Sequence, residues 1–352
     1  MINLPPSIQS IDIQIPHRNW ERALSESFAL LIAAQPGDVV CIAGPSRAGK
    51  TRLIQELCRL ITGGVSYEEN GKMSAVVVEA ANTGPNGTFS TKSFIHRMLE
   101  EVKHPIYSTA NVDIENPFAY QKMTRVTEAQ LRLALERALI WRGTKYLFID
   151  EAQHAKYAAK RSHAGHAIMD SWKCLAQSVG IVLVIVGAYP VLDILRDSPH
   201  LLGRKHQVHF PRYHETLDDL YEFALILAHY DQVIEIGSGV QTLQEFNELL
   251  YAGSLGCIGL LRGWLTRATA IASIRGNGVT RDILVETIIS NSDLKKIAFE
   301  IRYGEKVIGG GSFSEYKKEL IKDKCINNNK PFKRKPKRFK KNNRTDRDND
   351  DE

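Results

Sequence analysis

Two observations predict an α/β fold with a mainly parallel sheet for this chain of 352 residues. Short, continuously apolar runs such as residues 181–187 are typical of strands that are buried on both faces. Segments with helical periodicity separate these runs along the chain, as in a parallel sheet with crossover helices. From about Glu215 to Arg302 the strand signal disappears and helical patterns dominate. The sequence therefore predicts an α/β core followed by a helical subdomain.

The expected elements follow one another in a regular order. An amphipathic helix covers about Arg18–Ala34, and Pro36-Gly37 ends it. Strands are expected at 39–43, 75–79, 145–150 and 181–187. Helices are expected to begin at Lys50 and to cover about 93–101, 127–142 and 165–179, with surface loops at 82–87 and 104–118.

The first apolar strand leads into a G-x-x-x-x-G-K-T sequence, which in this strand-to-helix context predicts a phosphate-binding P-loop. Its glycines allow backbone N–H groups to turn toward phosphate oxygens, and the positive end of the following helix faces the same point. Lys50 is expected to neutralise the outer phosphates, and Thr51 to offer its hydroxyl to Mg²⁺. The expected nucleotide contacts are Gly44, Pro45, Ser46, Arg47, Ala48, Gly49, Lys50, Thr51 and Arg52.

Asp150 and Glu151 end another apolar strand. Two adjacent carboxylates also occur in solvated turns, but downstream of a P-loop they predict the acidic half of an ATPase site. Asp150 would then hold Mg²⁺ together with Thr51. Glu151 would accept a proton from the water that attacks the terminal phosphate of ATP.

Three stretches resemble the AAA+ ATPases of the TnsC/TniB type: Asp150-Glu151-Ala152-Gln153-His154, residues 178–187, and the block from His200-Leu201-Leu202-Gly203-Arg204-Lys205 to Phe210-Pro211-Arg212-Tyr213. The resemblance extends over about Pro16–Arg275. Proteins of this family regulate transposons that move by a separate DDE transposase, including CRISPR-associated ones. The resemblance implies a P-loop AAA+ fold with a helical lid, and ATP and Mg²⁺ as ligands.

Further site residues are implied by the resemblance alone. Arg204 matches the arginine finger that reaches the nucleotide of the adjoining subunit, with Arg196 and Arg212 as competitors. Arg262 matches the second sensor on the lid and would contact the outer phosphates, with Arg267 as a substitute. The strand-end position that usually carries a polar sensor is Ala188, so slow hydrolysis is expected unless Tyr189 compensates.

The net charge of +6 belongs to the C-terminal end of the chain. From Lys330 onward there are ten basic and five acidic residues, a net of +5, which leaves 36 basic and 35 acidic residues, a net of +1, for the remainder. This low-complexity tail is expected to be disordered, since it cannot bury enough apolar surface to fold alone. Phe332 and Phe339 lie among the basic residues of the tail. Three roles for the tail remain open: it docks on the transposase as a peptide, it binds DNA, or it only keeps the protein soluble.

The resemblance also implies a homo-oligomer, as a ring or helical filament, around double-stranded DNA. No base-reading motif is visible, which favours sequence-independent contact with phosphates. A TniQ-like targeting protein and the DDE transposase are the expected protein partners. The candidate DNA contacts are basic residues near the predicted long helix and after the acidic pair: Lys122, Arg125, Arg132, Lys156, Lys160 and Arg161.

Composition argues against several other classes of protein. No apolar stretch reaches the roughly 18 residues of a membrane helix, and the N-terminus lacks the pattern of a signal peptide. The five cysteines include no C-x-x-C pair, which fits reduced core thiols rather than disulfides or zinc. A soluble, cytoplasmic, bacterial protein without membrane contact is expected.

These observations predict four parts: an N-terminal extension and helix (1–34), a AAA+ core (35–214), a helical lid (215–308) and a flexible basic tail (309–352). The expected function is an ATPase that oligomerises on double-stranded DNA with ATP and conveys target-site selection to a transposase. Two alternatives remain open. A replication-initiator or helicase-loader type AAA+ ATPase would be expected to carry a DNA-reading domain after the lid. A nucleotide-stabilised DNA-binding scaffold with little hydrolysis is favoured by Ala188.

Overall fold

The computed structural model describes residues 15–65, 67–84, 87–108, 126–158, 164–196, 205–237 and 242–309. The chain divides into two units, 1–309 and 310–352, and the first unit contains all of these residues. The expectations for the C-terminal tail therefore lie outside the described residues.

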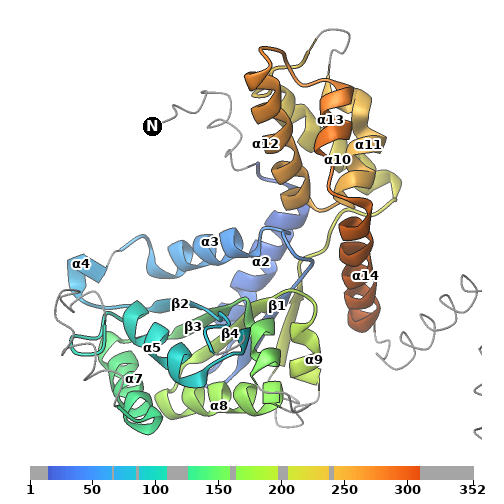
Figure 1. Ribbon diagram of the computed structural model, residues 1–352. Helices are drawn as coiled ribbons and strands as arrows, with labels where there is room; N and C mark the ends of the chain where they lie inside the picture. Colours follow the sequence, from blue (N-terminus) through green and yellow to red (C-terminus); the bar gives the residue numbers. More distant parts are fainter. Residues whose placement is uncertain are drawn as a thin grey trace, which may run out of the picture. The chain divides into compact units, whose positions relative to one another are not determined.

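Five parallel strands form one sheet in the order β2-β3-β4-β1-β5 (Figure 1). The strands are β1 (Val39–Ala43), β2 (Ala75–Glu79), β3 (Tyr146–Asp150), β4 (Val182–Gly187) and β5 (Lys205–His209). The two strands β1 and β4 are buried along their whole lengths, which explains their continuously apolar sequences. The parallel α/β fold expected from the sequence is confirmed. The edge strand β5 is not anticipated by the sequence because four of its five residues, KHQVH, are polar.

Helices cover both faces of this sheet (Figure 1). On one face α2 and α3 pack against alternate strand residues such as Val40, Ile42 and Phe148. On the other face α5, α7 and α8 pack against the intervening residues, such as Cys41 and Ile149. These helices are α2 (Arg18–Ala33), α3 (Lys50–Thr62), α5 (Thr91–Glu101), α7 (Glu128–Arg142) and α8 (Ala164–Val179). The short helices α4 (Tyr67–Asn70) and α9 (Val191–Arg196) and the 3-10 helix η3 (Ala152–Tyr157) complete this region.

Helices α10 to α13 share an apolar core of their own. Phe223, Leu261 and Trp264 lie at its centre, and Trp264 Nε1 donates a hydrogen bond of 3.0 Å to the carbonyl of Leu284. The elements are α10 (Leu217–Asp231), the 3-10 helix η5 (Leu243–Phe246), α11 (Asn247–Ser254), α12 (Ile258–Ile274) and α13 (Arg281–Thr287).

Helix α14 (Asn291–Ile308) joins the core of the α/β region instead, where its Ile301 is buried. A Cβ at Gly304 would come within 1.8 Å of the Tyr189 ring, so glycine is needed for this close packing. Within the described ranges, no single helix is long and apolar enough to cross a membrane. A pair bent by 116°, Leu243–Ser254 with Ile258–Ile274, would pass the same test together.

Candidate active site

The sheet order brings the carboxyl ends of β1, β4 and β3 into a row, because β4 lies between the other two strands. Ala43 at the end of β1 pairs with Gly187 at the end of β4, and Ile149 of β3 pairs with Ile185 of β4. The P-loop after β1 and the acidic pair at the end of β3 therefore meet at the same edge, where ligands bind in open α/β sheets.

The P-loop curls tightly around the start of α3. Gly49 caps this helix at φ 105°, a left-handed conformation that favours glycine. Lys50, only 6% exposed, donates hydrogen bonds from Nζ to the carbonyls of Gly44 (3.2 Å) and Pro45 (2.7 Å). Burial lowers the pKa of Lys50, whereas the charges of Glu151, Asp150 and Glu300 act to raise it. The ammonium group is thus held within the loop that is expected to bind phosphate.

Thr51 and Asp150 are in direct contact at the carboxyl ends of the strands. Thr51 Oγ1 donates a hydrogen bond of 2.8 Å to Asp150 Oδ2, while Asp150 Oδ1 accepts one of 2.8 Å from the N–H of Glu151. Burial raises the pKa of the Asp150 carboxyl, and these two hydrogen bonds partly oppose that rise. A hydroxyl and a carboxylate are hard oxygen ligands of the kind Mg²⁺ takes, so the donor set fits this ion. Among the described residues no cluster of three or more His, Cys, Asp or Glu could hold a metal ion, so phosphate oxygens and water would supply the other ligands.

Glu151 has a left-handed backbone conformation, with φ 53°, and its carboxylate contacts a side chain that the sequence did not single out. Gln153, in η3, donates a hydrogen bond from Nε2 to Glu151 Oε2. Its Oε1 accepts a hydrogen bond of 3.1 Å from the backbone N–H of Ala188, just after β4. The D-E-A-Q-H sequence already contained this residue, but nothing in its spacing indicated that it would reach the neighbouring strand.

Of the two alternatives left open at Ala188, compensation by Tyr189 finds no support, because the Tyr189 hydroxyl is engaged elsewhere in the chain. Its side chain is fully buried, and its hydroxyl lies 3.0 Å from His209 Nε2. Gly304 of α14 packs on its ring, which confines the side chain to the interior.

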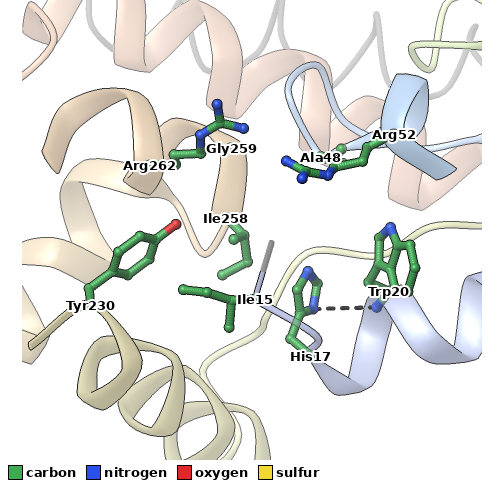
Figure 2. Close-up of a pocket in the computed structure, with 10 residues that line it drawn as sticks. Ile15, His17, Trp20, Ala48, Arg52, Tyr230, Ile258, Gly259 and Arg262 are labelled. Atoms are coloured by element: carbon green, nitrogen blue, oxygen red, sulfur yellow. Dashed lines mark hydrogen bonds between the residues drawn. The ribbon is translucent and has the colours of Figure 1, made fainter. Parts of the chain in front are cut away.

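A pocket beside the P-loop combines aromatic, apolar and cationic side chains (Figure 2). Figure 2 shows Ile15 and Ile258 between Tyr230 and the His17–Trp20 pair. His17 Nδ1 accepts a hydrogen bond of 3.3 Å from the backbone N–H of Trp20, and burial lowers the pKa of His17 to about 4. The imidazole is therefore neutral near pH 7. The residues lining this pocket are Ile15, His17, Trp20, Ala48, Gly49, Arg52, Tyr230, Ile258, Gly259 and Arg262.

Helix α12 rests directly on the P-loop. A Cβ at Gly259 would lie 1.9 Å from the carbonyl oxygen of Arg47, so only glycine fits this contact. Arg262, one turn further along α12, lines the pocket together with Ala48 and Gly49 of the P-loop. Arg267, the proposed substitute for Arg262, instead donates a hydrogen bond of 3.3 Å from Nη2 to the carbonyl of Thr287 within the helical subdomain.

A second contact reaches the P-loop from α14. Ser46 Oγ donates a hydrogen bond of 3.1 Å to Glu300 Oε1. Five residues later on α14, Glu305 accepts hydrogen bonds from Arg212 Nε (2.8 Å) and Nη2 (3.3 Å). Arg212 is thus engaged within its own chain, which makes it a poor candidate for an arginine finger. Arg204 lies outside the described residues.

Two of the six candidate DNA contacts, Arg132 and Lys156, lie among the described residues, and both make contacts within the chain. Arg132 donates to Glu136 (3.0 Å) and to Ser171, while Lys156 forms an ion pair of 3.1 Å with Asp193 and keeps 52% of its side chain exposed. The other four, Lys122, Arg125, Lys160 and Arg161, lie outside the described residues. DNA contact at these positions stays a prediction.

Comparisons with known proteins find one protein family and several solved structures to which this chain is similar. Residues 34–195 match the family described as an AAA domain. The Orc2 protein of Aeropyrum pernix, solved in ADPNP–ADP complexes, is similar in structure, with 14% identity, a TM-score of 0.50, and coverage of 82% of this chain and 74% of that one. Cdc6p of Pyrobaculum aerophilum gives 16% identity, a TM-score of 0.51, and coverage of 83% and 74%. No curated protein matches the sequence. At these identities the structural likeness shows the fold alone, which is the P-loop AAA+ fold.

Proposed function

We propose that this chain, which has the AAA+ fold and matches an AAA domain over residues 34–195, is an ATPase that binds and hydrolyses ATP with Mg²⁺. The observation that carries this proposal is the 2.8 Å contact between Thr51 Oγ1 and Asp150 Oδ2, next to Lys50 in the P-loop. The contact joins the hydroxyl and the carboxylate of a Mg-triphosphate site. Lys50, the residue before Thr51, supplies the ammonium. The Orc2 protein of Aeropyrum pernix, which has the same fold, was solved with ADP and ADPNP.

Each group of the site has a separate role in hydrolysis. The P-loop N–H groups and Lys50 hold the phosphates, and Arg262 approaches them from α12. Thr51 and Asp150 would hold Mg²⁺, which when bound neutralises charge on the β- and γ-phosphate oxygens. Glu151 accepts a proton from the attacking water.

The pocket in Figure 2 would take the adenine base. Its Ile15 and Ile258 offer apolar surface to the base, and Trp20 and Tyr230 offer aromatic rings. A neutral His17 adds no charge to the apolar part of this pocket.

The wider role is regulation of DNA transposition by a homo-oligomer assembled with ATP on double-stranded DNA. The D-E-A-Q-H sequence and the block from His200 to Tyr213 support it through their resemblance to TnsC/TniB-type ATPases. In this proposal Arg204 completes the site of the adjoining subunit, so hydrolysis depends on assembly. The C-terminal tail would dock on the transposase.

An initiator-type ATPase is the second candidate, because Orc2 and Cdc6p share the fold. The two roles differ in their use of DNA. A transposition regulator that takes up many targets binds duplexes of unrelated sequence with equal affinity, whereas an initiator prefers one sequence. Competition between random and defined duplexes separates them.

Assembly and phosphate release, measured with and without a long duplex, test the proposal. We expect assembly of the unmodified protein only with Mg-ATP, and duplex-stimulated hydrolysis. Lys50→Ala should abolish assembly, whereas Glu151→Gln should trap it. Arg59→Ala is the matched control, because Arg59 lies on the same helix but pairs with Glu56 in solvent. An assembly that forms equally well without ATP would overturn the proposal, and assembly with a flat, near-zero rate of hydrolysis would favour the scaffold alternative.

A further inference from the structure

The side-chain amide of Gln153 connects two residues at the carboxyl ends of the strands. Its Nε2 donates to Glu151 Oε2, and its Oε1 accepts from the N–H of Ala188 at 3.1 Å. Glu151 and Ala188 directly follow the ends of the neighbouring strands β3 and β4. One side chain therefore ties the carboxylate expected to act as the base to the strand end that usually carries a polar sensor.

The orientation of this amide is determined by its two partners. A backbone N–H can only donate, so the amide oxygen must face Ala188. A carboxylate can only accept, so the amide nitrogen must face Glu151. A primary amide carries two N–H donors, and the contact with Glu151 uses one of them.

The end of β4 is shaped to receive this side chain. A Cβ at Gly187 would lie 2.4 Å from Gln153 Oε1, so any larger residue at position 187 would displace the amide. The residue after it, Ala188, has no polar side chain and offers its backbone N–H. Glycine and alanine at these two positions thus leave room for a polar group that comes from η3, just after β3, instead of from β4.

We propose that Gln153 is the positioning residue of the hydrolytic step, which holds Glu151 toward the attacking water and replaces the polar side chain absent at Ala188. This inference rests on the proposed ATPase function. Gln153 acts through Glu151, so its loss should slow hydrolysis while leaving nucleotide affinity intact.

Two variants separate positioning from a structural role. Gln153→Ala removes both hydrogen bonds. Gln153→Glu keeps an acceptor for the Ala188 N–H, but it replaces the donor to Glu151 with a second carboxylate. Gln177→Ala is the control, because it makes the same change on the exposed side of α8.

Three measurements are needed: kcat and KM for Mg-ATP, the affinity for a fluorescent ATP analogue, and hydrogen exchange of the peptide that contains Ala188. We expect kcat to fall about 10- to 100-fold in both Gln153 variants, a part of what general-base catalysis contributes. Affinity should change less than about threefold. Exchange at Ala188 should rise in Gln153→Ala and stay low in Gln153→Glu.

The outcomes distinguish this inference from the function on which it rests. If Glu151→Gln abolishes hydrolysis while both Gln153 variants turn over like Gln177→Ala, Gln153 has no positioning role and the ATPase proposal stands. If Gln153→Glu retains full activity and only Gln153→Ala loses it, the role is structural and the inference is wrong. If the unmodified protein neither binds nor hydrolyses ATP, both the Gln153 inference and the ATPase proposal are wrong.

Discussion

Ser46 of the P-loop donates a hydrogen bond of 3.1 Å to Glu300 of α14, although 254 residues separate them in the sequence. The charge of Glu300 also acts on Lys50, where it favours the protonated amine. A carboxylate at this position would compete with a phosphate group for the same loop, because both are anions that accept hydrogen bonds from the same donors. Through Glu300, helix α14 therefore contacts the P-loop and acts on the charge of Lys50.

Replacement of Glu300 by glutamine should tighten nucleotide binding. The variant keeps an acceptor for Ser46 but removes a negative charge from the vicinity of the triphosphate. We expect about fivefold higher affinity for Mg-ATP, equivalent to about 1 kcal/mol for one charge pair in a well-screened site. Titration with a fluorescent ATP analogue measures it, with Glu286→Gln as the control, because Glu286 pairs with Arg275 in solvent. Equal or weaker binding by Glu300→Gln would show that the carboxylate does not oppose the phosphates.

Replacement of Gly259 by alanine should disturb the contact between α12 and the P-loop. The added Cβ would meet the Arg47 carbonyl oxygen at 1.9 Å, so either the loop or the helix must move. Overpacking of this kind costs about 1–3 kcal/mol of stability, and we expect nucleotide affinity to fall with it. Gly263→Ala is the matched control on the same helix, because its Cβ would meet no atom closer than 3.7 Å. Urea unfolding and ATP titration of both variants check the prediction, which fails if the two behave alike.

The buried His17 predicts a loss of stability at low pH. Burial lowers its pKa from 6.5 to about 4 in the folded chain, so the unfolded chain binds the proton more readily between these values. The stabilisation is complete above about pH 6.5 and is lost as the pH falls toward 4, by at most about 3 kcal/mol at 1.36 kcal/mol per pKa unit. The free energy of unfolding should therefore fall more steeply between pH 7 and pH 4.5 in the unmodified protein than in His17→Gln. Parallel profiles would contradict the buried, neutral imidazole.

Much of the α/β region could be predicted from sequence because its signals are local. A buried parallel strand needs apolar residues on both faces, so β1 and β4 are visible as continuous runs. The P-loop pattern locates the start of α3 at Lys50. Helix α7 begins after Thr127, which caps it together with Gln130, and the predicted boundary lies at this cap.

What could not be predicted depends on contacts between distant segments. The edge strand β5 is mostly polar and shows its strand character only by pairing with β1. The buried stripe of α2 consists of Asn19, Ala23, Ser27 and Leu31, so it includes two polar residues, whereas 66% of the apolar Ile32 is exposed. The roles of Gln153 and Glu300 depend on which strand ends and helices adjoin, which no spacing along the chain reveals.

The central claim is a Mg-ATP site built from Lys50, Thr51, Asp150 and Glu151, and ATP binding and turnover in two single variants test it most directly. We predict that Lys50→Ala weakens ATP binding at least about 100-fold, since the buried ammonium is lost. Glu151→Gln should bind ATP like the unmodified protein and hydrolyse it at least about 100-fold more slowly. Unchanged ATP binding by Lys50→Ala, with Arg59→Ala measured alongside, would contradict the account.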